Sequence, residues 1–285
     1  ICLAQIMNAI EPYDLKSYGH NSTKTIQVIT EAERRAYADR SHFLGDPDFV
    51  TIPIDTLMSK PYSTSRMKSF SFTQPTRSQT LSHGTINFTE SSETTHYSIV
   101  DQYGNAVSVT TTLNGAYGSK LFSPELGFFL NNEMDDFSSK PGVPNMFGLI
   151  GAEANKIEPE KRMLSSMTPT IVEKNGALFM VVGTPGGSTI ITSVLQVILN
   201  VHEYHMSMQE AVNQPRFHHQ WLPDVIMMEP YQFANSVKIE LQNKGYTIDE
   251  ENTPVIGKVD AILMRSDGKL EGGADYRGDD KALGF

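Results

Sequence analysis

Residues 94–112 read TTHYSIVDQYGNAVSVTTT, and this stretch decides the fold around it. Its side chains alternate with period two on either side of Gln102–Asn105, which is rich in turn-forming residues. The pattern predicts a β-hairpin with its turn near Tyr103. Opposed residues of an antiparallel pair have index numbers with a constant sum, here about 206. Thr94 is therefore expected opposite Thr112.

The two threonines are candidates for nucleophilic chemistry. Directly opposed residues have Cβ atoms ~4.5–5.5 Å apart, so the hydroxyls of Thr94 and Thr112 can form a hydrogen bond. Thr94 also follows a polar segment, where chain cleavage would expose an α-amino group beside its own hydroxyl. Such an amine has a pKa of ~7.7–8.0 and can accept the hydroxyl proton. From the hairpin alone, the alternative is two β-branched strand residues without a catalytic role.

Composition favours a small-molecule substrate. The chain has 285 residues, 39% hydrophobic and 20% charged, as is ordinary for a globular protein. A formal charge of -10 disfavours nucleic acid or an anionic membrane as partner. The one cysteine, Cys2, excludes an intrachain disulfide, and no stretch approaches the ~18 apolar residues of a membrane span.

The remaining periodicity predicts alternating helices and hairpins. Apolar residues at helical spacing predict one long amphipathic helix over 23–43. Residues 59–93 are rich in Ser, Thr, Pro, Gln and Lys and are expected to form an exposed connector. A second hairpin is expected over 168–182, followed by a glycine turn and a helix with an apolar face. Residues 259–268 suggest a last hairpin.

Several motifs together resemble those of one enzyme family. They are TTHYS at 94–98, NNEMDDF at 131–137, KR and LSSM within 161–167, PGGS at 185–188 and PRFHHQW at 215–221, with AYADR at 36–40 and LGDPDF at 44–49 upstream. Their order and spacing are similar to those of the γ-glutamyltransferases over essentially the whole chain. The resemblance implies an α/β fold of the N-terminal-nucleophile hydrolase type, an αββα sandwich of two stacked, largely antiparallel sheets. Residues 1–93 would be the C-terminal part of the large-subunit region with its connector. Residues 94–285 would be the small-subunit catalytic region of the same domain.

The resemblance also implies catalytic roles. Thr94 would be the nucleophile and the first residue of the small subunit after autocleavage of the Glu93–Thr94 bond. Thr112 would orient its hydroxyl, in agreement with the hairpin register. Gly186 and Gly187 would form an oxyanion hole, in which bare backbone N–H groups approach the developing negative charge.

Other positions match the residues that recognise the glutamyl group. Asn114, Glu133 and Asp136 would hold its α-amino end, because carboxylates are suitable partners for an ammonium. Ser165 and Ser166 would donate hydrogen bonds to its α-carboxylate. The implied reaction is hydrolysis of glutathione and other γ-glutamyl amides, or transfer of their γ-glutamyl group, without cofactor or metal. The remainder of the large subunit, absent from this chain, is the implied partner. Family analogy suggests the periplasm or the exterior, with any signal peptide upstream of Ile1.

Alternatives remain open at each motif. Taken singly, Ser165–Ser166 could be a strand lead-in, Gly186–Gly187 an ordinary turn and Asp135–Asp136 a solvated turn. The spacing of His202 and His205 is one residue short of the i, i+4 arrangement of metal ligands. Within the fold, the chain could be an acylase for a cephalosporin side chain or a capsule polymer. Because most of the large subunit is missing, including an arginine that clamps the substrate carboxylate in the family, a truncated non-catalytic fragment is the other alternative.

Overall fold

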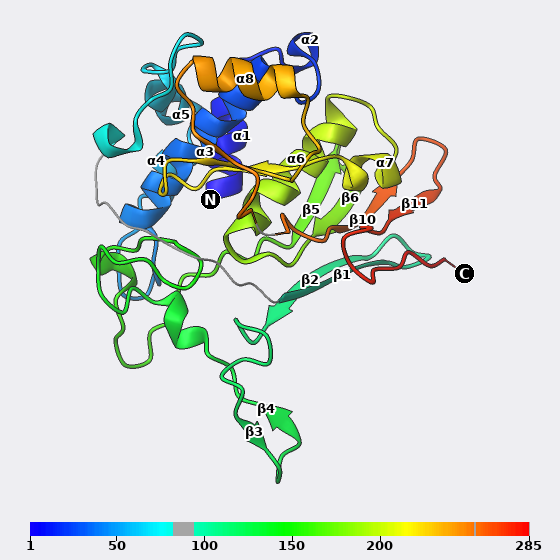
Figure 1. Cartoon of the computed structure of the whole chain (residues 1–285). Helices are drawn as coiled ribbons and strands as arrows, with labels where there is room; N and C mark the ends of the chain where they lie inside the picture. The colour runs from blue at the N-terminus through cyan, green and yellow to red at the C-terminus, as the bar shows by residue number, and fades with distance from the viewer. Residues whose placement is uncertain (82–93, 254, 285) are drawn as a thin grey trace. The chain divides into compact units, whose positions relative to one another are not determined.

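The computed structural model describes residues 1–81, 94–253 and 255–284 (Figure 1). The chain forms two compact units, each assembled from three stretches of sequence. Unit 1 contains Ile1–Ser91, Glu133–Ser165 and Phe217–Pro254, and unit 2 contains Ser92–Asn132, Ser166–Arg216 and Val255–Phe285. Among the described residues, no helix has both the length and the apolar character needed to cross a membrane.

Unit 1 is built around helix α3. Helices α1 and α5 pack on one another, and α1, α5 and α8 each contact α3 (Figure 1). A small sheet has the order β7-β8-β9, with β7 antiparallel and β9 parallel to β8. The elements of unit 1 are α1 (Cys2–Ile10), α2 (Leu15–Tyr18), α3 (Thr23–Phe43), α4 (Ile54–Leu57), α5 (Lys60–Met67), η1 (Ser78–Leu81), η2 (Glu133–Asp136), η3 (Glu153–Asn155), β7 (Phe217–His218), β8 (Ile226–Met228), α8 (Asn235–Asn243) and β9 (Ile248–Asp249).

Helix α3 confirms the span expected from the apolar spacing, but it is buried on nearly every side. Ser22 caps its first turn by accepting a hydrogen bond from the Thr25 backbone N–H at 3.2 Å. Several charges of the buried polar face form ion pairs, both within the helix and with other segments: Arg35 Nη1 lies 2.6 Å from Glu31 Oε2, and Arg66 Nη2 lies 2.9 Å from Asp39 Oδ1. The amphipathic pattern therefore marks two packed surfaces of different polarity, since a buried charge requires a partner.

The prediction of an exposed connector over 59–93 is wrong for the first part of this range, where helix α5 forms. Ser59 caps this helix by accepting a hydrogen bond from Tyr62 N at 3.3 Å, and a proline occupies the first turn. Ser63 and Met67 are buried. Local capping and packing thus override the polar composition of this stretch. Residues 82–93 lie outside the described residues.

Unit 2 contains the hairpins and the apolar-faced helix that the sequence predicts. A four-stranded antiparallel sheet has the order β11-β10-β6-β5, and β1 pairs with β2. The elements are β1 (Thr94–Val100), β2 (Ala106–Thr112), β3 (Phe122–Ser123), β4 (Phe128–Phe129), β5 (Thr170–Lys174), β6 (Ala177–Gly183), η4 (Gly187–Thr189), α6 (Ile190–His202), α7 (Met208–Asn213), β10 (Asp260–Met264) and β11 (Leu270–Gly273).

The β1–β2 hairpin stacks on the four-stranded sheet, whose other face carries α6 and α7 (Figure 1). Ser108 Oγ donates to the Val182 carbonyl at 3.2 Å, and a Cβ added at Gly183 would lie 2.1 Å from the His96 ring. His96 is held between Thr110 Oγ1, at 2.8 Å from Nδ1, and Ser98 Oγ, at 3.1 Å from Nε2. Burial lowers the His96 pKa to about 4, so the ring is neutral at physiological pH. Only glycine fits at 183 beneath it.

The short β3–β4 hairpin is stabilised mainly by aromatic contacts, because its strands pair at only two positions. The Phe129 ring lies 5.3 Å from that of Tyr117 and 5.2 Å from that of Phe122, between ring centroids. The hairpin extends away from the other strands of unit 2 (Figure 1). Large apolar residues are exposed along it: Tyr117, Leu121, Phe122, Leu126, Phe128 and Leu130.

Candidate active site

The first strand pair brings together Thr94, Thr112 and Asn114. Thr94 is the Cα partner of Thr112, which confirms the register expected from the sequence. Thr94 Oγ1 donates to Thr112 Oγ1 at 3.3 Å, and the Asn114 backbone N–H donates to the same oxygen at 2.8 Å. Both side chains therefore point to the same side of the hairpin at the open end of the two strands. The Thr112 hydroxyl is fixed by the backbone that follows it, so it can in turn fix the hydroxyl of Thr94.

Asn114 sits just after β2 in a left-handed backbone conformation, with φ +74°. Its side chain is buried and donates from Nδ2 to the Asn132 carbonyl at 3.3 Å. Asn132 Oδ1 in turn accepts from the Gly115 backbone N–H at 2.8 Å. Asparagine tolerates this backbone region better than most residues. The two asparagines thus fix the path of the chain directly after Thr112.

The glycine turn after β6 presents two backbone N–H groups. Gly186 has φ +138° and Gly187 φ +54°, conformations that L side chains rarely adopt. The Gly186 carbonyl accepts from Thr189 N at 3.0 Å and from Thr189 Oγ1 at 2.8 Å, which holds the turn against the start of α6. Within the described part of the chain, neither glycine N–H donates a hydrogen bond. Backbone N–H groups at the start of a helix are a general binding site for anions.

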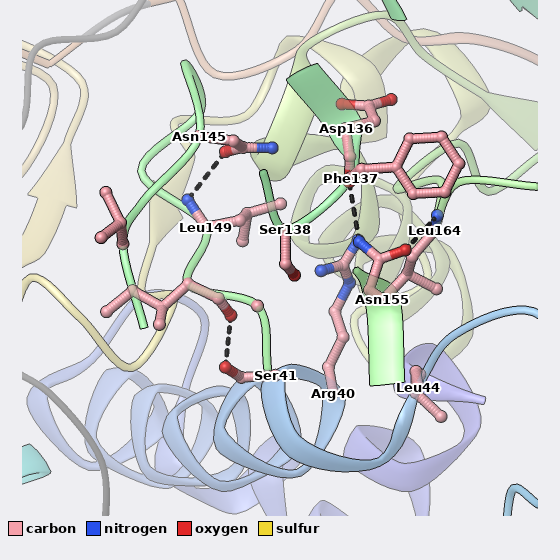
Figure 2. Close-up of a pocket in the computed structure, with 13 residues that line it drawn as sticks. Arg40, Ser41, Leu44, Asp136, Phe137, Ser138, Asn145, Leu149, Asn155 and Leu164 are labelled. Carbon is pink, nitrogen blue, oxygen red and sulfur yellow. Dashed lines mark hydrogen bonds between the residues drawn. The ribbon is translucent and has the colours of Figure 1, made fainter. Parts of the chain in front are cut away.

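Glu133 and Asp136 begin and end the 3₁₀ turn η2 in unit 1. Asp136 lines a pocket with Arg40 of α3, and Figure 2 shows Arg40 projecting from α3 below the turn that carries Asp136. The pKa of Asp136 is raised to about 7, mainly by burial; Arg40 lowers it, and the nearby carboxylates of Glu133 and Asp135 raise it. Burial also raises the pKa of Glu133. A bound ammonium would relieve this clustering of negative charge.

Ser165 and Ser166 lie where the chain leaves unit 1 and enters unit 2. Ser165 is exposed and Ser166 is half-buried, with its carbonyl accepting from Thr168 Oγ1 at 2.9 Å. The backbone before Ser165 is fixed, because the Leu164 N–H donates to Asn155 Oδ1 at 3.0 Å.

The structure thus assigns the candidate residues to two groups. Unit 2 contains Thr94, Thr112, Asn114, Ser166, Gly186 and Gly187, and unit 1 contains Glu133, Asp136 and Ser165. The contact between His96 and Gly183 joins the strand that begins at Thr94 to the strand that ends three residues before Gly186. In the described ranges, no group of three His, Cys, Asp or Glu side chains is placed to hold a metal ion.

Sequence reasoning missed Asn155, which contacts the backbone of two segments that line the pocket. It also missed the role of Asp46, whose carboxylate accepts from Arg162 N at 2.8 Å and from Arg162 Nε at 3.0 Å. The contacts of Asn155 and Asp46 described here join residues more than eight positions apart in sequence. No local pattern signals them, although Asp46 and Arg162 both lie within motifs quoted above.

Comparison with known proteins identifies relatives over the full chain. The family model described as gamma-glutamyltranspeptidase matches residues 1–285. The glutathione hydrolase proenzyme of Escherichia coli K12 is 46% identical over 286 residues, covering 100% of this chain and 49% of that protein. The glutathione hydrolase proenzyme of Pseudomonas aeruginosa is 44% identical over 283 residues, covering 98% of this chain and 50% of that protein. The chain therefore spans about half the length of these curated relatives.

The chain is also similar to solved structures. A mutant Helicobacter pylori gamma-glutamyltranspeptidase is 54% identical with a TM-score of 0.62, over 65% of this chain and 100% of that one. A cephalosporin acylase from Bacillus halodurans has a TM-score of 0.78 at 21% identity, over 98% of this chain and 48% of that one. The stacked antiparallel sheets and their helices define an N-terminal-nucleophile hydrolase fold, as the sequence predicted. Within that class, the chain belongs to the gamma-glutamyltranspeptidase family.

Proposed function

We propose that this chain supplies the catalytic half of a γ-glutamyltransferase, which hydrolyses glutathione and related γ-glutamyl amides or transfers their γ-glutamyl group. The observation that carries the proposal is the 3.3 Å hydrogen bond from Thr94 Oγ1 to Thr112 Oγ1, at the first residue of β1. Family membership supports the substrate class. Autocleavage before Thr94 is part of the proposal, and Glu93 lies outside the described residues.

The proposed reaction begins at the Thr94 hydroxyl. Cleavage of the Glu93–Thr94 bond frees the α-amine of Thr94, which accepts the hydroxyl proton as Oγ attacks the γ-carbonyl carbon. The Gly186 and Gly187 N–H groups stabilise the negative carbonyl oxygen. The C–N bond then breaks, the leaving amine takes up the proton, and a γ-glutamyl ester remains on Thr94. Water or an amino acid resolves this ester.

Recognition of the glutamyl end falls to the remaining candidates. Asp136 and Glu133 are carboxylates in a partly buried turn and suit an α-ammonium. Asn114 adds a buried amide beside the nucleophile pair. Ser165 and Ser166 are hydroxyl donors for the α-carboxylate. The remainder of the large subunit is the proposed partner, and export to the periplasm or exterior remains a prediction from the resemblance.

Paired anilide substrates test this function. The chain is assayed alone and as a fusion to the half of the Escherichia coli relative that the alignment does not cover. We expect p-nitroaniline release from the γ-glutamyl anilide and little from the glutaryl anilide, which lacks the α-amine. Faster cleavage of the glutaryl compound would favour an acylase, a possibility given weight by the Acylase ACY 1 proenzyme of Pseudomonas sp. V22, 35% identical over 279 residues. No release by either preparation would identify a non-catalytic fragment.

The pKa of Asp136 predicts how substrate preference varies with pH. With a pKa of about 7, Asp136 is largely protonated below that pH and pairs poorly with an ammonium. The carboxylate forms as pH rises through this value, so kcat/KM for the γ-glutamyl anilide, divided by that for the glutaryl anilide, should rise about tenfold per unit at low pH. It should level off above the pKa of Asp136 until the α-ammonium of the substrate loses its own proton. Because the Thr94 amine acts on both substrates, the effect of its titration cancels in the ratio.

The measurement is this ratio between about pH 5 and pH 9, with Asp136→Asn as the matched variant. Asparagine keeps the size of the side chain and cannot ionise, so the rise should disappear. A rise that persists unchanged in Asp136→Asn would show that another group recognises the ammonium.

A further inference from the structure

Asn155 joins two segments of unit 1 that are far apart in sequence. Its Nδ2 donates to the Asp136 carbonyl at 2.8 Å, and its Oδ1 accepts from the Leu164 N–H at 3.0 Å (Figure 2). Its own carbonyl accepts from Ser138 N at 2.8 Å. Asn155 is 4% exposed. One buried amide therefore uses its donor on one segment and its acceptor on the other.

These two segments carry the proposed ammonium-binding group and the proposed carboxylate-binding group of the recognition site. Asp136 is itself a proposed ligand of the α-ammonium, and Leu164 directly precedes Ser165, a proposed ligand of the α-carboxylate. An amino acid presents these two charges at a fixed separation. The site must therefore hold its carboxylate and its hydroxyl at a matching separation, and a rigid link between their backbones provides this.

A second anchor fixes the 162–165 segment at its first residue. The Arg162 backbone and side chain both bind the Asp46 carboxylate, which follows α3 and is 3% exposed. These bonds hold the pKa of Asp46 well below its usual range. Arg162 thus attaches the segment to the helical core, whereas Asn155 sets its position relative to Asp136.

We propose that Asn155 is a positioning residue that sets the spacing between the ammonium-binding and carboxylate-binding groups of the site. It acts through Asp136 and Ser165 and does not itself contact substrate. This inference rests on the proposed function, because it assigns Asn155 a role in recognition of the γ-glutamyl group.

The test measures KM and kcat for γ-glutamyl and glutaryl anilides in whichever preparation is active. Asn155→Ala removes both side-chain bonds. It should raise KM for the γ-glutamyl anilide by roughly 10-fold to 100-fold while kcat stays within about twofold. Asn155→Asp keeps the shape and the acceptor for Leu164 but lacks the donor to Asp136. Asn155→Asp should lower the preference for the γ-glutamyl over the glutaryl anilide about tenfold. This variant also tests the inference if Asn155→Ala does not fold.

Asn200→Ala is the matched control. Asn200 is 5% exposed and donates from Nδ2 to the Ala211 carbonyl at 3.1 Å in unit 2, so its loss also removes a buried amide. It should lower the melting temperature without raising KM. Wild-type KM and substrate preference in both Asn155 variants would overturn the inference. So would an equal loss of kcat on both substrates, which indicates a general structural defect. A wild-type protein without preference for γ-glutamyl would refute the proposed function and the inference with it.

Discussion

Replacing Thr94 with alanine is expected to leave the polypeptide intact and to abolish anilide release. The proposed cleavage needs the Thr94 hydroxyl to attack the preceding carbonyl, and catalysis needs both this hydroxyl and the amine that cleavage frees. Removal of a nucleophile costs on the order of 10⁴-fold to 10⁶-fold in rate in well-studied hydrolases. Mass spectrometry of the incubated protein should find a break before Thr94 in the wild type and a single species of 31.7 kDa in Thr94→Ala of the 285-residue chain.

Two further variants make this result specific. Thr94→Ser keeps a hydroxyl and should still be cleaved. Thr95→Ala changes the next residue, which is exposed and faces the other side of β1, and should be cleaved like the wild type. Cleavage of Thr94→Ala at the wild-type rate would assign the nucleophile to another residue.

Replacing Gly186 with alanine should lower kcat by about 10²-fold to 10³-fold, the usual cost of losing an oxyanion donor. Gly186 has φ +138°, and a Cβ there would lie 2.7 Å from Thr189 Oγ1 and 3.3 Å from the Gly257 Cα. The turn must therefore shift, which moves the N–H groups of Gly186 and Gly187 away from the reacting carbonyl. KM should change little, because the ground-state carbonyl depends less on these donors than the developing oxyanion does.

Gly268→Ala is the control for backbone strain alone. Gly268 has φ +80° in the turn after β10, and a Cβ there meets nothing within 4 Å. It should cost about 1 kcal/mol of folding free energy without changing kcat. A Gly186→Ala enzyme with wild-type kcat, measured beside this control, would remove the glycine pair from the mechanism.

The parts of the fold that the sequence predicts are those set by local periodicity. Strict alternation around one turn gave the Thr94–Thr112 register, and apolar spacing gave the span of α3. Helix α5 was missed because its polar composition concealed a serine cap and a proline in the first turn. The β7-β8-β9 sheet has strands of only two or three residues, which are too short to show a period.

The candidate site was predictable where motifs carry it and hidden where distant contacts do. Thr94 and Thr112 follow from the hairpin, and the other site residues came from the resemblance. The link through Asn155 joins positions 19 and 9 residues away, and nothing in the residues around it marks an amide with this task. The raised pKa of Asp136 likewise depends on burial, which only the folded chain produces, and the fold also brings near Arg40, which lowers this pKa.

The contact between His96 and Gly183 constrains how this protein can diverge. Because the imidazole fills the space that any Cβ at position 183 would occupy, a larger residue there requires a smaller one at 96 in the same step. Each change alone leaves either an overlap or a void between the two sheets. Relatives that alter one of these two positions are therefore expected to carry a compensating change at the other.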